Sequence, residues 1–318
     1  MTNLLTRHLL TGAELSSPEM LHLFKLAQQF KQARAKGLTT PLLANQHLAL
    51  LFSKPSLRTR FSFTVAMREL GGDVVESVSD HRKAEEPEDQ IRVLAGYCHA
   101  VMVRTHADAY LTRMAQVSSI PVINGLSNNY HPCQALADML TLQECFHELK
   151  NLHLAYIGDG NNVLHSLLLT APRLGIKLHY CCPQDRAPLP HVVAKAVASA
   201  ANGGSVVACD SPLAAVSDAH AVYTDVWTSM GFEGQVALDQ FAGFQVNEAL
   251  MKYARTDAVF MHCMPMQRGQ EVSVTLPDKP CSVIYQQSEN RLHVQKALLA
   301  ALLSKQPIHS ILTEEQYS

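Results

Sequence analysis

Hydroxyl and guanidinium side chains gather in one short segment, Ser53–Arg60, directly after an apolar run typical of a buried strand. Beyond it, apolar residues from Phe63 to Leu70 recur at helical spacing, so the segment is predicted to join a strand to a helix. The first N–H groups of a helix and its dipole favour an anion, and Arg58 adds paired donors suited to phosphate oxygens. An anion site is one interpretation, and a capped helix with solvated arginines is the other.

A second group of polar side chains could hold a carbonyl or an amide. Arg104 closes another apolar run, and His131 and Gln134 lie beside Pro132, a residue type favoured at the first position of a helix. Each of them alone is weak evidence. A single histidine at a helix start is more often a cap or a structural hydrogen-bond partner than a catalyst.

The second half of the chain opens with a glycine turn between a predicted strand and a predicted helix. Gly158 and Gly160 match the first two positions of the dinucleotide motif G-x-G-x-x-G, and Asp185 could serve as the ribose-binding acid. Val163 stands at the third glycine position, where its side chain would crowd the contact between helix and strand. Nicotinamide binding is therefore an alternative that the broken motif disfavours.

Two later segments place a carboxylate and a thiol after apolar strands. Asp225 suits an amine ligand through charge-assisted hydrogen bonds, and the only tryptophan, Trp227, stands beside it. Cys263 could be a nucleophile, a weak polar contact or a small buried hydrophobic residue. The last of these is the default for an isolated cysteine.

Short apolar runs alternate with longer helical patterns over nearly the whole chain, which is typical of an α/β protein with parallel strands. The predicted strands are His47–Phe52, Val74–Val78, Ala100–Arg104, Pro121–Ile123, His153–Ile157, Lys177–Cys181, Ser205–Cys209, Ala221–Thr224 and Ala258–Met261. Prominent helices are predicted after Ser56, from Pro132, and from Glu289 to Leu303.

Five polar positions lie just beyond the carboxyl ends of predicted strands: Ser56, Arg104, Asn162, Asp225 and Cys263. In open α/β sheets, ligands bind at that edge. We therefore expect two domains, each a parallel β-sheet flanked by helices, with the active site in the interdomain cleft. The expected limits are residues 1–147 for the first domain, with the C-terminal helix 289–318 packing back on it, and residues 148–288 for the second.

The composition fits this architecture. A chain of 318 residues suits two domains, and 47% hydrophobic with 17% charged residues indicate a folded protein. The net charge of -2 gives no general attraction to nucleic acid or acidic membranes, and no apolar run approaches the ~20 residues that cross a bilayer. The eight cysteines form no C-x-x-C pair, so we expect reduced thiols in the cytoplasm.

The motifs resemble, in order and spacing, those of the aspartate and ornithine carbamoyltransferase family over nearly the whole chain. Residues 56–60 (Ser-Leu-Arg-Thr-Arg) are similar to the family's carbamoyl-phosphate signature, and residues 131–138 look like its second shared motif. Residues 225–231 and the His-Cys-Met-Pro sequence at 262–265 are similar to the ornithine branch. The aspartate branch carries a proline at the position of Cys263 and lacks the Ser-Met-Gly loop.

The resemblance implies a role for each matching residue. The implied carbamoyl-phosphate site consists of Ser56, Leu57, Arg58, Thr59, Arg104, His131, Gln134, Cys263, Met264 and Arg291, the last on a turn at 289–291. The implied ornithine site consists of Asn162, Asp225, Ser229 and Met230. The residues implied to act in catalysis are Arg104, His131, Asp225 and Cys263.

The resemblance also implies the reaction and the assembly. Carbamoyl phosphate and L-ornithine would be the substrates, and the carbamoyl group would pass to the δ-amine to give L-citrulline and phosphate. No metal, cofactor or covalent intermediate is required. The expected protein is a cytoplasmic homotrimer, or a multiple of trimers, that serves arginine biosynthesis or catabolism and binds neither nucleic acid nor membranes.

Residues 81–89 depart from the family pattern, because Glu86 and Pro87 replace the usual serine and its apolar neighbour. In many relatives this loop reaches the site of a neighbouring subunit. A solvated acidic loop is one interpretation, and an altered lid that selects a modified amine is the other. The alternatives are therefore another acceptor, such as an acylated ornithine or putrescine, and a catalytically impaired paralogue.

Overall fold

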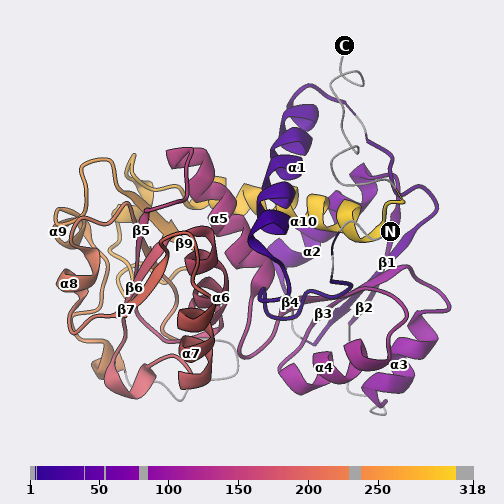
Figure 1. Ribbon diagram of the computed structural model, residues 1–318, viewed down its shortest axis with the longest axis horizontal. Coiled ribbons are helices and arrows are strands. Elements are labelled where there is room, and N and C mark those ends of the chain that lie inside the picture. The colour runs from indigo at the N-terminus through magenta and orange to yellow at the C-terminus, as the bar shows by residue number, and fades with distance from the viewer. Residues whose placement is uncertain are drawn as a thin grey trace. The chain divides into compact units, whose positions relative to one another are not determined.

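A computed structural model gives the fold of the chain and describes residues 4, 6–38, 40–53, 55–78, 85–228 and 238–305. The chain forms two compact units (Figure 1). The first consists of Met1–Ser127, His131–Leu136 and Asn290–Ser318, and the second of Asn128–Tyr130 and Ala137–Glu289. The predicted α/β architecture is confirmed, because each unit contains a parallel sheet with helices around it. The domain limits expected from the sequence stay a prediction.

The first unit is built on a four-stranded parallel sheet with the strand order β2-β1-β3-β4. Its strands are β1 (His47–Phe52), β2 (Asp73–Val78), β3 (Ala100–Arg104) and β4 (Val122–Leu126). From β1 the chain proceeds to β2 on one side, whereas β3 lies on the other side of β1. The strand order therefore reverses between β1 and β3, and a ligand crevice is expected beyond the carboxyl ends of these two strands.

The helices of the first unit are α1 (Ser17–Ala35), α2 (Leu57–Glu69), α3 (Pro87–Leu94), α4 (Asp108–Val117), the first residues of α5 (Pro132–Phe146) and the larger part of α10 (Ile284–Leu303), from Asn290 onward. Helix α2 forms as its apolar spacing predicts, with Phe63 and Met67 fully buried. The helix ends at Glu69, just before Gly71, whose φ of 81° is a conformation that glycine adopts readily.

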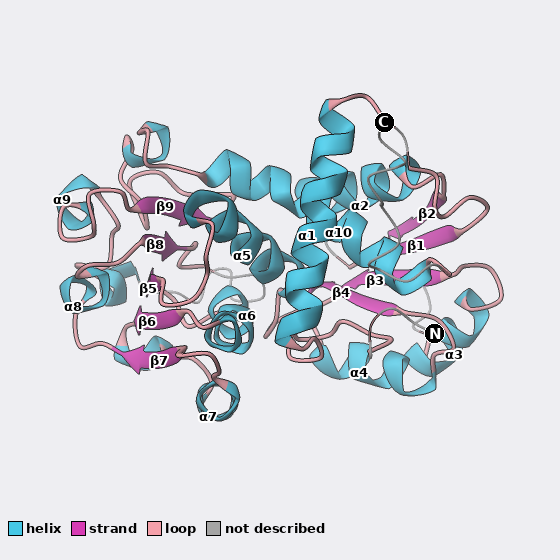
Figure 2. Ribbon diagram, turned by 45° about the horizontal axis from the view of Figure 1, so that its top comes forward, coloured by secondary structure: helices cyan, strands magenta, loops and turns pink. Residues whose placement is uncertain are grey.

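The second unit contains a five-stranded parallel sheet with the order β7-β6-β5-β8-β9. Figure 2 shows these strands beside one another in this order. Its strands are β5 (His153–Ile157), β6 (Lys177–Cys181), β7 (Ser205–Ala208), β8 (Ala221–Thr224) and β9 (Val259–His262). Here the order reverses between β5 and β8. Across both sheets, five predicted strands have the observed limits, and the other four are displaced or changed in length by a few residues.

The helices of the second unit are the remainder of α5, α6 (Asn162–Thr170), α7 (Pro190–Ser199), α8 (Pro212–Val216), α9 (Glu248–Met251) and the first residues of α10 (Ile284–Leu303). Short 3-10 helices lie at η1 (Ala171–Leu174), η2 (Gln184–Arg186), η3 (Leu238–Phe241) and η4 (Leu276–Asp278). The core of this unit includes Ile157, Val222 and Phe260 from three neighbouring strands.

Helix α10 corrects one sequence prediction. The helix was expected to begin at Glu289, and Arg291 was placed on a turn at 289–291, whereas the helix begins five residues earlier at Ile284. Arg291 therefore stands within a helix and not on a turn. The apolar spacing hid the first turn because Gln287 within it is polar and fully buried.

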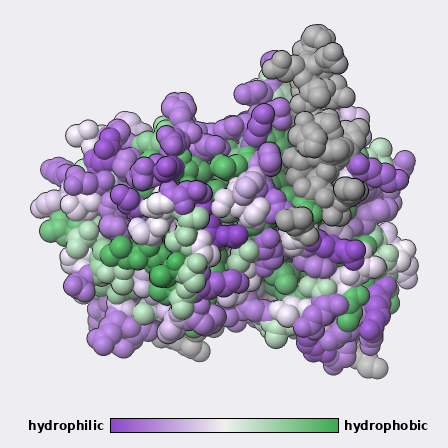
Figure 3. All heavy atoms as spheres, viewed as in Figure 1, coloured by the Kyte–Doolittle hydropathy of each residue, from purple (hydrophilic) through white to green (hydrophobic). Residues whose placement is uncertain are grey.

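On the face shown in Figure 3, hydrophilic side chains are interspersed with smaller hydrophobic patches. Within the described part of the chain, no helix is both long and apolar enough to span a membrane. Among the described residues, no two cysteines form a disulfide.

A buried lysine fixes α10 to α1 and α2 in the first unit. The Nζ of Lys296 donates to Glu69 Oε2 at 3.0 Å and lies 4.8 Å from the centre of the Phe30 ring. Arg34 pairs with the same glutamate. Burial, with a smaller contribution from the charge of Arg34, lowers the pKa of Lys296 to about 8.

This lowered pKa predicts a specific dependence of stability on pH. Between pH about 8 and the unfolded lysine value of ~10.4, the unfolded chain binds more protons at this position than the folded chain. The free energy of unfolding should therefore gain a rising contribution across that window, and Lys296→Met should remove it. Urea unfolding at a series of pH values measures the difference between the two proteins.

Lys25→Met, at an exposed position of α1, provides the matched control. Its stability curve should run parallel to that of the unmodified chain. Parallel curves for Lys296→Met as well would contradict the assigned pKa.

Candidate active site

In the first unit, the start of α2 and the end of β3 lie side by side. Ser56 caps α2, and its hydroxyl accepts the N–H of Thr59 at 3.4 Å. Arg104, the last residue of β3, donates from Nη1 to the same hydroxyl at 3.2 Å. The backbone supports this approach, because Ser53 N–H donates to Arg104 O at 2.9 Å. A guanidinium is thus held at the positive end of a helix, which favours an anion.

Arg291 connects two other predicted residues. Its Nη1 donates to Gln134 Oε1 at 2.8 Å, and its Nη2 donates to the Thr59 hydroxyl at 3.0 Å. The side chain is 2% exposed, so these bonds form away from bulk water. Through Arg291, the start of α5 is fixed to the first turn of α2.

His131 lies among three guanidiniums. It is buried, and burial together with the charges of Arg291, Arg104 and Arg58 lowers its pKa well below the usual value. The imidazole is therefore neutral at physiological pH. Three cations around a neutral ring make this part of the first unit strongly attractive to an anion.

The neighbours Leu57 and Arg60 do not extend this cation cluster. Leu57 is 70% exposed, so only its backbone can contribute to the start of α2. Arg60 pairs with Glu76 at 2.6 Å and lies over the ring of Phe52. Within this segment, Arg58 is the arginine whose charge lowers the pKa of His131.

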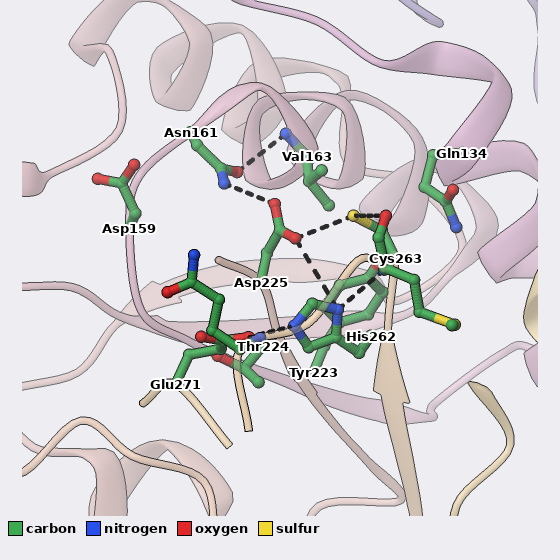
Figure 4. Close-up of polar contacts among 12 residues, drawn as sticks. Gln134, Asp159, Asn161, Val163, Tyr223, Thr224, Asp225, His262, Cys263 and Glu271 are labelled. Atoms are coloured by element: carbon green, nitrogen blue, oxygen red, sulfur yellow. Dashed lines mark hydrogen bonds and ion pairs between the residues drawn. The ribbon is translucent and has the colours of Figure 1, made fainter. Parts of the chain in front are cut away.

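In the second unit, Asp225 follows β8 and is held by two donors (Figure 4). The Asn161 amide donates from Nδ2 to Asp225 Oδ2 at 2.8 Å. The thiol of Cys263, just after β9, donates from Sγ to Oδ1 at 2.9 Å. This contact is consistent with the polar role that the sequence offers for Cys263. Asp225 itself is 3% exposed and can accept further bonds from an amine.

Behind Cys263 lies a histidine–glutamate pair that sequence reasoning missed. His262 Nδ1 accepts the N–H of Met264 at 2.9 Å, so the ring proton lies on Nε2 and points to Glu271 Oε1 at 3.1 Å. Both side chains are almost fully buried. The pair fixes the backbone at Met264, whose φ is 58°. Glu271 stands nine residues from His262 in the sequence, with no motif to mark the contact.

Asn161, which follows the glycine turn, is a residue of this site that sequence reasoning missed. It contacts Asp225 and also caps α6, where its Oδ1 accepts the N–H groups of Val163 and Leu164. Asn162 is buried beside it at the first position of the helix. The assignment of Asn162 to ornithine stays a prediction. The sequence could have revealed the role of Asn161, since asparagine before a helix is a typical cap.

The glycines of this turn have a structural explanation. Gly158 has a φ of 133°, and a Cβ on Gly160 would lie 2.4 Å from Arg186 O and Pro188 N. Both positions thus require glycine for the backbone alone. The glycine pattern therefore gives no support to nicotinamide binding.

Two predicted positions, Ser229 and Met230, lie outside the described residues, as do residues 81–84. Just before the first of these, Trp227 stacks on Phe241 with 4.8 Å between the ring centres. In the unusual 81–89 segment, Glu86 precedes α3 and pairs with Arg113 of α4 at 2.5 Å, as Glu88 does at 2.6 Å. These acidic side chains are therefore engaged within their own unit.

Asp225, His262 and Cys263 also have side-chain types that bind metals, and their ligand atoms lie within 4.8 Å of one another. The bonds of Cys263 to Asp225 and of Met264 to His262 account for this proximity. The expectation that the chain needs no metal stays a prediction.

The two polar clusters occupy equivalent places in their sheets. Ser56 follows β1 and Arg104 ends β3, and the first sheet reverses its order between these two strands. Asn161 and Asp225 follow β5 and β8, between which the second sheet reverses its order. Ligands of open α/β sheets bind at such positions.

Comparisons with known proteins agree with this geometry. Residues 7–144 match the family model described as the aspartate/ornithine carbamoyltransferase carbamoyl-P binding domain, and residues 150–302 match that of the Asp/Orn binding domain. An ornithine carbamoyltransferase of Archaeoglobus fulgidus is 42% identical over 94% of this chain and 98% of its own length. One from Parasynechococcus marenigrum is 45% identical over 93% and 94%.

Solved structures give the same result. The ornithine carbamoyltransferase from Pyrococcus furiosus has a TM-score of 0.89 and 40% identity, covering 93% of this chain and 97% of its own. An N-acetyl-L-ornithine transcarbamylase has a TM-score of 0.83 at 28% identity, covering 93% and 100%. With both family models matched in order along the chain, the protein belongs to the aspartate/ornithine carbamoyltransferase family.

Proposed function

We propose that this protein transfers the carbamoyl group of carbamoyl phosphate to the δ-amine of L-ornithine, giving L-citrulline and phosphate. The cation cluster of Arg58, Arg104 and Arg291 around neutral His131 is the observation that carries the proposal. It supplies the strongly cationic environment that a doubly charged acyl phosphate requires. Asp225, held by Asn161 and Cys263, supplies the matching carboxylate for an amine.

The donor would bind through residues of the first unit. The phosphate would accept backbone N–H groups at the start of α2, from Ser56 to Thr59, and the Arg58 guanidinium. The carbamoyl group would lie against Arg104, His131 and Gln134. Arg291 holds Thr59 and Gln134 and so acts chiefly as a positioning residue. Cys263 and Met264 would complete the donor site.

The amine substrate would bind through Asn162, Asp225, Ser229 and Met230. For Asp225, the bonds from Asn161 and Cys263 supply a fixed orientation. These bonds also keep the carboxylate paired before substrate arrives, which limits the cost of its burial. We propose that both sets of residues act on the same pair of substrates.

The reaction follows from these charges. The neutral δ-amine attacks the carbonyl carbon, a C–N bond forms, and the C–O bond to phosphate breaks. Arg104 can stabilise negative charge on the carbonyl oxygen, and neutral His131 can donate a hydrogen bond. The leaving phosphate accepts the proton that the amine loses. Since an amine of this type has a pKa of ~10.4, the site must select its minor neutral form or remove its proton.

Another acceptor, such as an acylated ornithine or putrescine, is the alternative, together with a catalytically impaired paralogue. The 81–89 segment motivates both. In this segment, the described Glu86 and Glu88 pair with Arg113. Supplying carbamoyl phosphate with each amine in turn, and measuring ureido product and phosphate, separates the three possibilities.

We further propose that the protein acts in the cytoplasm as a homotrimer or a multiple of trimers, in arginine biosynthesis or catabolism. The family resemblance supports this assembly and pathway. Sedimentation of the purified chain would test the assembly.

Arg58→Gln should reduce kcat/KM for carbamoyl phosphate by at least about 100-fold, because one charged donor to the transferring group is lost. The melting temperature should change little, since Arg58 is partly exposed at a helix start. Citrulline formation at varied carbamoyl phosphate measures the effect. Arg68→Gln, exposed near the other end of α2, is the matched control and should keep full activity. Equal activities of the two variants would refute the anion-site assignment.

Asn161→Asp separates the two tasks of Asn161. Aspartate caps a helix as well as asparagine does, so α6 should remain stable. The donor to Asp225 is lost and a like charge is added, so kcat/KM for ornithine should fall by at least about tenfold. Initial rates at varied ornithine measure this.

Asn247→Asp is the matched control, because Asn247 caps α9 by the same two kinds of bond. The Asn247→Asp protein should retain the kcat/KM for ornithine of the unmodified chain. Unchanged ornithine kinetics in Asn161→Asp would show that the orientation of Asp225 does not depend on Asn161.

A further inference from the structure

Helix α10 begins with a polar side chain in the interior of the second unit. Gln287 lies in the first turn of this helix and is fully buried. Its side-chain amide makes three hydrogen bonds within the unit. An apolar side chain of similar size would fill the same space without needing partners, because only a polar group is costly to bury unpaired. The polarity at this position therefore calls for a reason beyond packing.

On one side, Gln287 completes the outer edge of β9, the last strand of its sheet. Phe260 N–H donates to Cys281 O at 2.8 Å, and Val283 N–H donates to Phe260 O at 3.0 Å. Two residues further along β9, the N–H of His262 points to the same side. The chain after Val283 has already entered α10, so Gln287 Oε1 accepts this N–H instead, at 2.9 Å. The side chain thus takes the place of a neighbouring strand at the end of β9.

On the other side, the same amide reaches α5 and β8. Gln287 Nε2 donates to Asp138 Oδ1 at 2.7 Å and to the Tyr223 hydroxyl at 3.1 Å, and both partners are fully buried. Burial, and next the charge of Asp138, raise the pKa of Tyr223 well above its usual value, so the hydroxyl keeps its proton. A backbone N–H only donates and an ionised carboxylate only accepts, which fixes the orientation of the amide between His262 and Asp138.

The carboxylate of Asp138 also strengthens the bond on the far side of the amide. An amide whose N–H groups donate to a carboxylate is polarised, and its oxygen becomes a better acceptor. The effect is larger in a buried site than in water, because the interior screens charge less. A chain of hydrogen bonds therefore runs from Asp138 through Gln287 to the backbone of His262.

The end of this chain lies next to the amine-site carboxylate. His262 directly precedes Cys263, whose Sγ donates to Asp225 Oδ1 at 2.9 Å. In the sheet, His262 is paired in register with Thr224, the residue before Asp225. The position of the His262 backbone therefore decides whether the thiol reaches the carboxylate.

We propose that Gln287 is a positioning residue for carbamoyl transfer. It holds the end of β9 so that the Cys263 thiol reaches Asp225, the carboxylate that we assign to the amine substrate. Its own hydrogen bonds go to residues that we assign to no substrate. The inference rests on the proposed function, since it concerns the same amine site.

Initial rates of citrulline formation by Gln287→Met test the proposal. Methionine fills a similar volume but offers neither the acceptor nor the donors. The KM for ornithine should rise by at least about tenfold, because Asp225 loses its fixed geometry. The KM for carbamoyl phosphate should stay near its normal value, since Gln134 and Arg291 keep their own bond. A merely structural defect would instead lower kcat through the amount of active protein and leave both KM values unchanged.

Gln286→Met is the matched control. Gln286 is the preceding residue of α10, and its Nε2 donates to Glu144 Oε2 of α5 at 2.8 Å. Both KM values of this variant should equal those of the unmodified chain.

Two further substitutions of Gln287 sharpen the test. Gln287→Glu keeps an oxygen that can accept the His262 N–H, so its KM for ornithine should rise less than that of Gln287→Met. Gln287→Asn keeps the amide but is one carbon shorter, so it cannot span the distance from Asp138 to His262. It should raise the ornithine KM selectively, and it decides the question if Gln287→Met does not fold.

Amide hydrogen exchange measures the bond to β9 without catalysis. The His262 N–H should exchange at least about tenfold faster in Gln287→Met, or in Gln287→Asn, than in the unmodified chain. The Phe260 N–H, which donates to Cys281 O, should keep its rate.

An unchanged ornithine KM in a folded variant, or an unchanged exchange rate at His262, would overturn the proposal. An unmodified chain that forms no citrulline would instead refute the proposed function, and the inference with it. The unmodified chain thus tests the reaction, and the comparison with its Gln287 variants tests the positioning role.

Discussion

The structure of the first unit depends on one electrostatic constraint, the gathering of positive charge around a buried imidazole. Arg58, Arg104 and Arg291 all lower the pKa of His131. Bringing three cations into a partly buried space is unfavourable unless an anion compensates them. Two of the cations donate to neutral groups, Arg104 to Ser56 and Arg291 to Thr59 and Gln134.

The second unit holds a buried negative charge, whereas the first unit holds positive charges. A buried carboxylate, Asp225, receives neutral donors from Asn161 and Cys263 and so keeps its negative charge for an incoming amine. In both units the polar residues lie where the strand order of the sheet reverses. The parallel topology thus explains why residues distant in sequence converge, since the carboxyl ends of neighbouring strands share one edge.

Much of this could be predicted from the sequence. Continuous apolar runs gave the observed limits of β1, β3, β5, β6 and β8, and the helical spacing after Ser56 indicated α2. Contacts such as His262–Glu271 could not be predicted, because no local pattern distinguishes a buried glutamate from a surface one. The predicted start of α10 was wrong for a related reason. Its buried face carries Gln287, Asn290, Arg291 and Lys296, which a search for apolar spacing assigns to the surface.

Binding of carbamoyl phosphate alone, without an amine, tests the central claim most directly. If the cation cluster is an anion site, carbamoyl phosphate should raise the melting temperature in a concentration-dependent way, by linkage to the folded state. The rise should shrink as salt is added, because the attraction is electrostatic. A melting temperature that does not respond to carbamoyl phosphate, even at low ionic strength, would contradict the account.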